Sequence, residues 1–550
     1  MLCCYNIKVN MSEITKVMYA REHIVSDTQK TRILRQGGSR VNQQVFPSSS
    51  WGSPGSPLIQ SSFSISPPST QTIVDRNIRV KCYLEVQVDQ PLQIGTNDSL
   101  RQFPIAAITD VVTMQINGET ISQNTADLIA AMNCYHNDSY DRNRAVSTSP
   151  AQPDQYQKYS DWQQYGSARN VCADYGENSS EMSRGGFPIT IAPDGLSFRC
   201  ELVEPLFLSP FLSGQEEDEG MVNVNQMNLS LRFVQLTGRV LSHSSAGNPI
   251  TTVSASFYQA PELLINYVTP MITYPLPTVQ TLPYSKLQQY IKPVGNFTSG
   301  STQTLISDSI KLSLIPHRMY AFVRHSRSSS DYTVADSFAK ISRMSVLWNN
   351  QSGLLSTASE QELFDICSKN DCNLSYPQFS KYRGSVMCVE FGKDIGLQSN
   401  EASGTSGQWT IQVQIEATNL TDTGDFEFFL VFDQPGTFSC FENGARASIG
   451  NFSEQMVLSA QQGDVESNHA VYQALHGSGK GRFMKGFRNF VHRFASGLGD
   501  VAKMASPIIG SLAPELAPAV SLVSQIAPAV AQATKGGSRT TGGRLSRMRR

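Results

Sequence analysis

The sequence is poor in charged residues and contains no long apolar run. Charged side chains make up 16% of its 550 residues, where about 25% is usual for soluble domains. No run of about 18 apolar residues occurs, which argues against a transmembrane helix. The first residues contain no apolar segment followed by a small-residue cleavage site, so we expect no signal peptide. Apolar residues still make up 40% of the chain, which is enough to build large hydrophobic cores.

The ten cysteines do not form a metal-binding pattern. None stands in a Cys-x-x-Cys motif, and the eight histidines do not cluster with them. Zinc sites need such groups of closely spaced ligands. We therefore expect buried thiols, and neither a metal nor another cofactor.

The motifs of common enzymes are missing or incomplete. The sequence contains no His-Glu-x-x-His and no Gly-x-Ser-x-Gly. The stretch that begins at Gly477 lacks the first glycine and the final Ser or Thr of a phosphate-binding loop. Asp422-Thr423-Gly424 matches an aspartic-protease tripeptide, but it lies between two alternating segments, as a hairpin turn would. The sequence predicts a protein that is not an enzyme.

Short segments of alternating apolar and polar residues recur along the chain. Between Ile78 and Val88 the alternation is strict, as in a strand with one buried and one wet face. Similar segments begin at Val112, Met227 and Ile411, whereas helical periodicity is scarce before residue 480. This pattern predicts an all-β fold of antiparallel sandwiches or jelly rolls.

A weak internal repeat divides the chain. Residues 106–132 resemble residues 339–366, and residues 197–212 resemble residues 385–398. In the first pair a strand leads into an Asn-containing turn, Asn117-Gly118 or Asn349-Asn350, and a short helix follows. Chance similarity is the alternative. We predict the following segments: an extended N-terminal arm (1–74), a first jelly roll (75–270), a Pro-rich linker (271–294), a second jelly roll (295–445), a linker (446–476) and a basic, amphipathic and flexible C-terminal tail (477–550).

Three strings carry a resemblance to a known family: VEPLFLSPF (203–211), WNNQSGLL (348–355) and VEFGKDI (389–395). Together with the two predicted jelly rolls, they make the sequence similar to the double-jelly-roll major capsid proteins. This hexon-type lineage includes adenoviruses, polinton-like viruses, adintoviruses and virophages. The resemblance implies a homotrimer whose six jelly rolls form a pseudo-hexameric capsomer of an icosahedral shell. It also implies a virion protein, assembled in the host cytoplasm or nucleus, with minor capsid proteins as partners.

Other readings of the sequence stay open. A β protein that binds a receptor or a carbohydrate is one alternative, and a hydrolase on a β scaffold is another. A capsid protein with a single jelly roll and a protrusion domain is a third. The absence of a catalytic motif speaks against the hydrolase, and the basic tail speaks against a secreted lectin.

The C-terminal tail carries most of the positive charge. From Gly477 onward there are twelve Lys and Arg residues and two acidic residues, whereas the preceding residues have a net charge of −12. A basic tail on an acidic body indicates a polyanion or an anionic surface as the partner.

Two segments of the tail are candidate binding sites. The first predicts a membrane-binding amphipathic helix, or alternatively a helix docked beneath the shell. Its apolar stripe is Phe483, Phe487, Phe490, Val491 and Phe494, and its cations are Lys480, Arg482, Lys485, Arg488 and Arg493. The second predicts contact with the viral genome, or alternatively a solvated tail or a nuclear-import signal. Its arginines are Arg539, Arg544, Arg547, Arg549 and Arg550.

A candidate cleavage site precedes the tail. Leu475-His476-Gly477-Ser478-Gly479 is similar to the pattern cut by adenovirus-type maturation proteases. The resemblance implies cleavage between Ser478 and Gly479, and a plain linker is the alternative.

Overall fold

The computed structural model describes most of the chain between residues 40 and 457. The described residues are 40–69, 72–94, 97–135, 157–159, 189–211, 220–244, 249–269, 276–398, 400–441, 444–450, 453–454 and 457.

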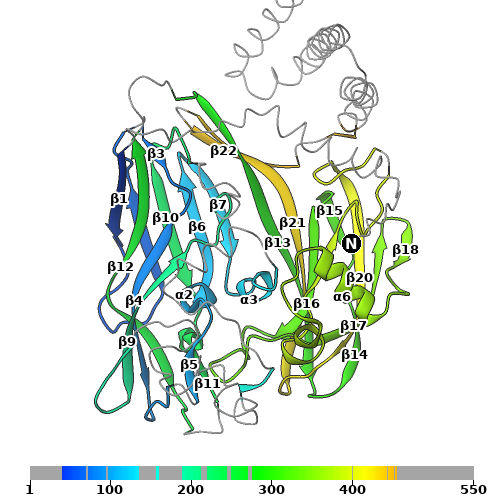
Figure 1. Ribbon diagram of the computed structural model, residues 1–550, viewed down its shortest axis with the longest axis horizontal. Helices are drawn as coiled ribbons and strands as arrows, with labels where there is room; N and C mark the ends of the chain where they lie inside the picture. The colour runs from blue at the N-terminus through cyan, green and yellow to red at the C-terminus, as the bar shows by residue number, and fades with distance from the viewer. Residues whose placement is uncertain are drawn as a thin grey trace, which may run out of the picture. The chain divides into compact units, whose positions relative to one another are not determined.

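Two antiparallel sheets form a first sandwich (Figure 1). One sheet has the order β1-β12-β4-β9-β8, with β3 also paired to β12, and the other has the order β2-β10-β6-β7. Their strands are β1 (Arg40–Pro47), β2 (Gln60–Ile65), β3 (Ile73–Val74), β4 (Arg79–Val88), β6 (Thr109–Ile116), β7 (Glu119–Asn124), β8 (Ile189–Ile191), β9 (Ser197–Pro205), β10 (Met227–Phe233) and β12 (Val253–Thr269). Shorter elements are β5 (Asp98–Leu100) paired with β11 (Leu241–His243), helices α2 (Pro104–Ile108) and α3 (Ile129–Met132), and the 3₁₀ turn η3 (Thr237–Val240).

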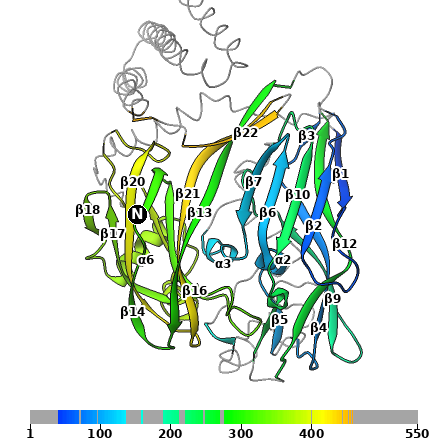
Figure 2. The ribbon, with the colours of Figure 1, turned by 180° about the vertical axis from the view of Figure 1, so that it is seen from behind.

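Two further sheets form a second sandwich, which Figure 2 shows from behind. Their orders are β13-β21-β16-β19, with β22 also paired to β21, and β14-β20-β17-β18, with β15 also paired to β20. The strands are β13 (Val279–Phe297), β14 (Thr302–Ile306), β15 (Ile310–Leu314), β16 (Arg318–His325), β17 (Lys340–Trp348), β18 (Gln351–Leu354), β19 (Met387–Glu390), β20 (Ser406–Thr418), β21 (Gly424–Phe441) and β22 (Gly444–Ile449). Helix α6 (Glu360–Lys369) and the short helical turn η4 (Gln378–Tyr382) lie between β18 and β19 along the chain.

Both sandwiches have the same strand order. The eight principal strands of the first are β1, β2, β4, β6, β7, β9, β10 and β12, and those of the second are β13, the pair β14 and β15, β16, β17, β18, β19, β20 and β21. In each, the first, eighth, third and sixth strands form one sheet, and the second, seventh, fourth and fifth form the other. An eight-stranded double sheet of this kind is a jelly roll, and the predicted fold class, two tandem jelly rolls, is confirmed.

The alternating pattern in the sequence produces the two cores. Along β4, the side chains of Val80, Cys82, Leu84 and Val86 are buried, as the period of two requires. They belong to the core of the first sandwich, and Phe426, Phe428, Phe429 and Phe432 of β21 contribute to that of the second. The seven cysteines of the described residues are free thiols, six of them buried and Cys372 partly so.

The internal repeat corresponds to equivalent structure. Asn117 follows β6 and Asn349 follows β17, and both adopt the left-handed conformation, with φ of 48° and 49°. Each turn is held in the same way. The backbone N–H of Asn117 donates to the Gln226 carbonyl, and that of Asn349 donates to the Thr410 carbonyl. Each Asn side-chain oxygen accepts a bond from the backbone N–H of the same partner, at 3.2 and 2.9 Å.

The predicted arm and linkers are wrong in their bounds. Strands β1, β2 and β3 lie within the predicted arm of residues 1–74, yet they pair with β12 and β10 inside the first jelly roll. Most of the predicted linker 271–294 lies in β13, the first strand of the second jelly roll, and β22 extends to Ile449, into the second predicted linker.

The predicted bounds are wrong because proline and serine were taken as signs of an arm or a linker, whereas these strands contain both. Pro283 and Pro293 lie in β13, an edge strand that pairs on one side only with β21. Pro261 lies in β12 where the pairing with β4 shifts register. Edges and bulges are the positions at which a strand can contain a residue without an N–H.

Candidate functional site at the junction of the two sandwiches

The residues predicted to bind a membrane or nucleic acid, or to be cleaved, lie beyond residue 457 and outside the described part of the chain. They stay predictions from the sequence. The described residues instead contain a buried polar site that no sequence motif predicted. It lies where the two sandwiches meet.

A buried ion cluster joins the sandwiches. Arg101, between β5 and α2, and Arg239, on the η3 turn, both belong to the first sandwich. Their guanidinium groups bind the two carboxylate oxygens of Asp336, which precedes β17, at 2.9 and 2.6 Å. The Arg101 side chain is 0% exposed and that of Asp336 is 11% exposed. Arg101 also donates to the backbone carbonyls of Asp331 and Val334, at 2.6 and 2.8 Å.

The cluster keeps its charges because they face one another. Burial alone would raise the pKa of Asp336, but the nearby guanidiniums of Arg101, Arg239 and Arg324 outweigh it and hold the pKa well below its usual range. Burial lowers the pKa of Arg324 to about 10, with help from Arg239. The ion pairs therefore persist throughout the neutral range of pH.

A second group of ion pairs lies beside the first. Arg327, just after β16, binds Asp127 and Asp110 of the first sandwich, the latter at 2.6 Å. Arg324 donates to the backbone carbonyl of Asp127 at 3.1 Å. Arg383 donates to the carbonyl of Ala130 in α3, at 2.8 Å. Arginines of the second sandwich thus bind backbone and carboxylates of the first.

The two sandwiches also exchange apolar residues. Leu282 and Tyr284 of β13 and Phe438 of β21 are part of the first core. In the other direction, Leu128 and Ala131, at helix α3, are part of the second core. Figure 1 shows β13 and β21 on the side of the second sandwich that faces the first. The junction is therefore packed like a protein core, because each sandwich contributes residues to the core of the other.

One arrangement at the junction resembles part of a catalytic triad. His243 Nδ1 lies 2.7 Å from an oxygen of Asp98, and both side chains are buried. Within the described part of the chain, however, His243 Nε2 has no hydrogen-bond partner, so no nucleophile completes a triad. The backbone N–H of His243 donates to the Tyr332 carbonyl, which ties β11 to the second sandwich. The His243–Asp98 pair therefore has a structural role at the junction.

His325 gives the fold a dependence on pH. Its ring is buried against Phe426, and its Nε2 lies 2.9 Å from Thr421 Oγ1. Burial lowers the pKa of His325 to about 4. The unfolded chain takes up a proton near pH 6.5, whereas the folded chain does so only near pH 4. The contribution of neutral His325 to the free energy of unfolding is therefore fully present above pH 6.5 and is lost as the pH falls towards 4.

We expect His325→Gln, which cannot be protonated, to remove this loss. Between about pH 7 and about pH 4 the parent chain should lose up to about 3 kcal/mol more stability than the variant. Urea unfolding at both values measures the difference. Parallel losses in the two proteins would contradict the assignment.

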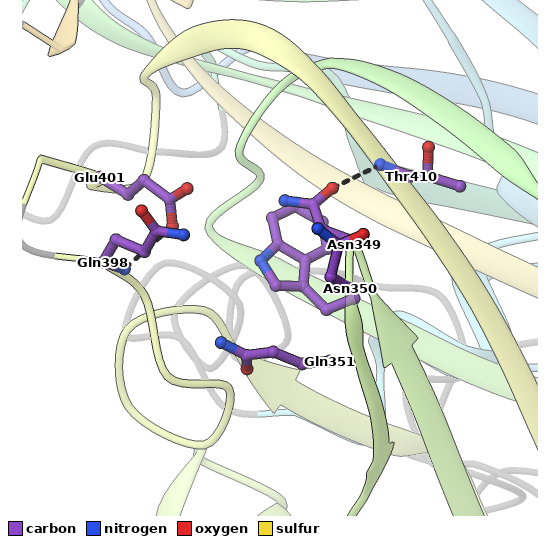
Figure 3. Close-up of a pocket in the computed structure, with 7 residues that line it drawn as sticks. Asn349, Asn350, Gln351, Gln398, Glu401 and Thr410 are labelled. Carbon is purple, nitrogen blue, oxygen red and sulfur yellow. Dashed lines mark hydrogen bonds between the residues drawn. The ribbon is translucent and has the colours of Figure 1, made fainter.

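A polar pocket of about 440 Å³ lies at one end of the second sandwich (Figure 3). Gln398 and Glu401 lie on one side of it, and Asn349, Asn350 and Gln351 lie on the other. Trp348 and Thr410 complete its lining. Glu401 is held in place, because its carboxylate accepts bonds from the backbone N–H of Gln398 and from the Trp409 indole. The pocket offers carboxamide groups that can both donate and accept hydrogen bonds.

The described residues contain no group of three or more His, Cys, Asp or Glu placed to hold a metal ion. None of the helices in the same part of the chain is long and apolar enough to cross a membrane.

Comparisons with known proteins agree with the fold. Residues 12–196 match the family model of the Sputnik virophage major capsid protein 1st domain, and residues 287–436 match that of the major capsid protein V20 C-terminal domain. The putative capsid protein V20 of Sputnik virophage is 29% identical over 542 aligned positions, and the match covers 88% of this chain and 88% of that one.

Solved structures give the same result. The Sputnik virophage structure obtained by cryo-EM superposes with a TM-score of 0.70 at 29% identity and covers 78% of this chain and 92% of that one. The mavirus major capsid protein has the same fold, with a TM-score of 0.61 at 15% identity over 78% of this chain and 94% of that one. The chain therefore belongs to the double-jelly-roll major capsid proteins, and it is a structural protein of a viral capsid.

Proposed function

We propose that this capsid protein assembles as a homotrimer, which forms a pseudo-hexameric capsomer of an icosahedral shell. The observation that carries the proposal is the repeated strand order in two sandwiches joined by a buried junction. One chain presents two equivalent units in a fixed relation, so three chains arranged around an axis present six.

The mass of the purified protein tests this proposal. Three chains of 60.4 kDa give a particle of about 180 kDa, which light scattering coupled to size-exclusion chromatography measures directly. Electron micrographs of the same peak should show hexagonal outlines. A monomer of 60.4 kDa at all concentrations would contradict the proposal and favour the alternative of a receptor- or carbohydrate-binding β protein.

We propose further that the C-terminal tail faces the interior of the particle. The support comes from its composition, since residues 477–550 have a net charge of +10. Such a segment neutralises phosphate groups of a genome or of lipid headgroups without reading sequence. Cleavage after Ser478 would release this tail from the shell. Minor capsid proteins, and assembly in the host cytoplasm or nucleus, belong to the same proposal.

A further inference from the structure

In the first sandwich, the turn between β6 and β7 is partly covered by the second sandwich. The Glu119 carboxylate, at the start of β7, accepts a hydrogen bond of 3.1 Å from the backbone N–H of Ala447 in β22. Strand β13 lies over the same region: Tyr284 is 7% exposed and packs in the first core. Burial raises the pKa of Tyr284, and the negative charge of nearby Glu119 raises it further.

The second sandwich has the same turn without such a cover in the described structure. Because Asn349 and Asn117 are equivalent, Gln351 of β18 occupies the position of Glu119 in β7. Gln351, Ser352 and Gly353 are exposed, and Gln351 lines the polar pocket. Glu119 is half-buried in the first sandwich, whereas its equivalent Gln351 is exposed in the second.

The equivalent of the covering strand is also exposed. Strand β1 pairs along the last eight residues of β12, and the first eight residues of β13 pair along the last eight of β21, both without a bulge. Val45 and Tyr284 are the sixth residues of these two strands. Val45 is 50% exposed, whereas Tyr284 is buried. At the fourth position, Gln43 is exposed and Leu282 is buried.

We propose that strand β1 of one copy covers the β17–β18 turn of the next, which places Val45 beside Gln351. The contact between copies then repeats the contact that the two sandwiches make within one chain. The inference rests on the proposed trimer and names the faces through which its copies meet. A large exposed apolar side chain and an open polar pocket are each closed by this arrangement.

The geometry of the junction supports the choice of a second copy as the occupant. The face of the first sandwich that corresponds to the open one is filled by residues of this same chain, namely β13 and β22. Around a closed ring of copies, each second sandwich meets the first sandwich of its neighbour. The exposed face of β1 is the part of that neighbour equivalent to β13.

Cysteine cross-linking tests the contact. In the double variant Val45→Cys with Gln351→Cys, a short bismaleimide should join copies into dimers and trimers on denaturing gels. Glu119→Cys with Ala447→Cys is the positive control, because those two residues touch within one chain, and it should give a cross-linked monomer. Val45→Cys with Thr304→Cys is the negative control. Thr304 is exposed on β14, at the edge opposite to β18 in the sheet that contains Gln351. The parent chain shows the reaction of the native thiols.

The outcomes separate this inference from the proposed function. A trimer in which Val45→Cys with Gln351→Cys joins copies supports both. A trimer in which the positive control reacts and that pair does not would overturn the inference and leave the trimer standing. A monomer would overturn both.

A charge pair gives a second measurement with intact cysteines. Val45→Lys with Gln351→Lys sets like charges against each other, and Val45→Lys with Gln351→Glu sets opposite charges together. The trimer of the like-charged variant should dissociate at a concentration about tenfold higher, equivalent to about 1.4 kcal/mol. Equal dissociation of the two variants would place Val45 and Gln351 apart.

Discussion

Replacing Asp336 with alanine should lower the free energy of unfolding by about 3–5 kcal/mol. The substitution leaves Arg101 and Arg239 buried without the carboxylate that binds both. Removing one partner of a buried ion pair costs far more than the pair itself contributes, because the remaining charge has lost its water and its partner. Since Asp336 belongs to one sandwich and the arginines to the other, the junction should loosen first.

Denaturant unfolding followed by tryptophan fluorescence measures the effect. Asp308→Ala is a matched control, because Asp308 also pairs with a basic residue, Lys292, but on the surface. That variant should change stability by less than about 1 kcal/mol. If the two variants behaved alike, the buried cluster would not hold the sandwiches together.

Gly384→Ala should destabilise the protein by at least about 3 kcal/mol. Gly384 has a φ of 91°, and a β-carbon there would lie 1.9 Å from the backbone carbonyl oxygen of Phe338. A backbone atom cannot rotate away as a side chain can. The backbone N–H of Phe338 donates to Arg383, and its ring packs on Phe322 in the second core, so any shift disturbs that core.

Gly55→Ala separates the two causes of this loss. Gly55 has a φ of 77°, similar to that of Gly384, but no atom lies within 4 Å of a β-carbon built there. Its substitution therefore incurs only the conformational cost of about 1–2 kcal/mol. Thermal unfolding of both variants shows whether the collision adds to it. Equal losses would mean that the chain at Phe338 gives way freely.

The sequence was most informative where one face of a strand is buried. Strict alternation from Ile78 to Val88 marked β4, and the Asn-containing turns marked the repeat, because few residues adopt the left-handed conformation of Asn117 and Asn349. Prediction failed in β1 and β13. The composition of these edge strands follows the demands of an edge, where proline and polar residues are tolerated, rather than the demands of a core.

The junction could not be predicted from the sequence. Arg101 and Asp336 meet although they are 235 positions apart in the sequence, and neither stands in a motif. Buried arginines look like surface arginines in a sequence, because only the fold decides which of them lose their water. The difference between the exposed turn at Gln351 and its half-buried counterpart at Glu119 also depends on the fold, because residues of β22 reach only the latter.

Strand β21 has a consequence for synthesis of the protein. Its Phe426–Phe432 half lies in the second core, and Phe438 and Cys440 lie in the first. A ribosome that has completed the first sandwich up to Thr269 has therefore not yet made the residues that close its core. The nascent sandwich keeps an apolar face uncovered until β21 and β22 emerge. During that interval the uncovered apolar face is accessible to neighbouring nascent chains, and completing the chain buries it.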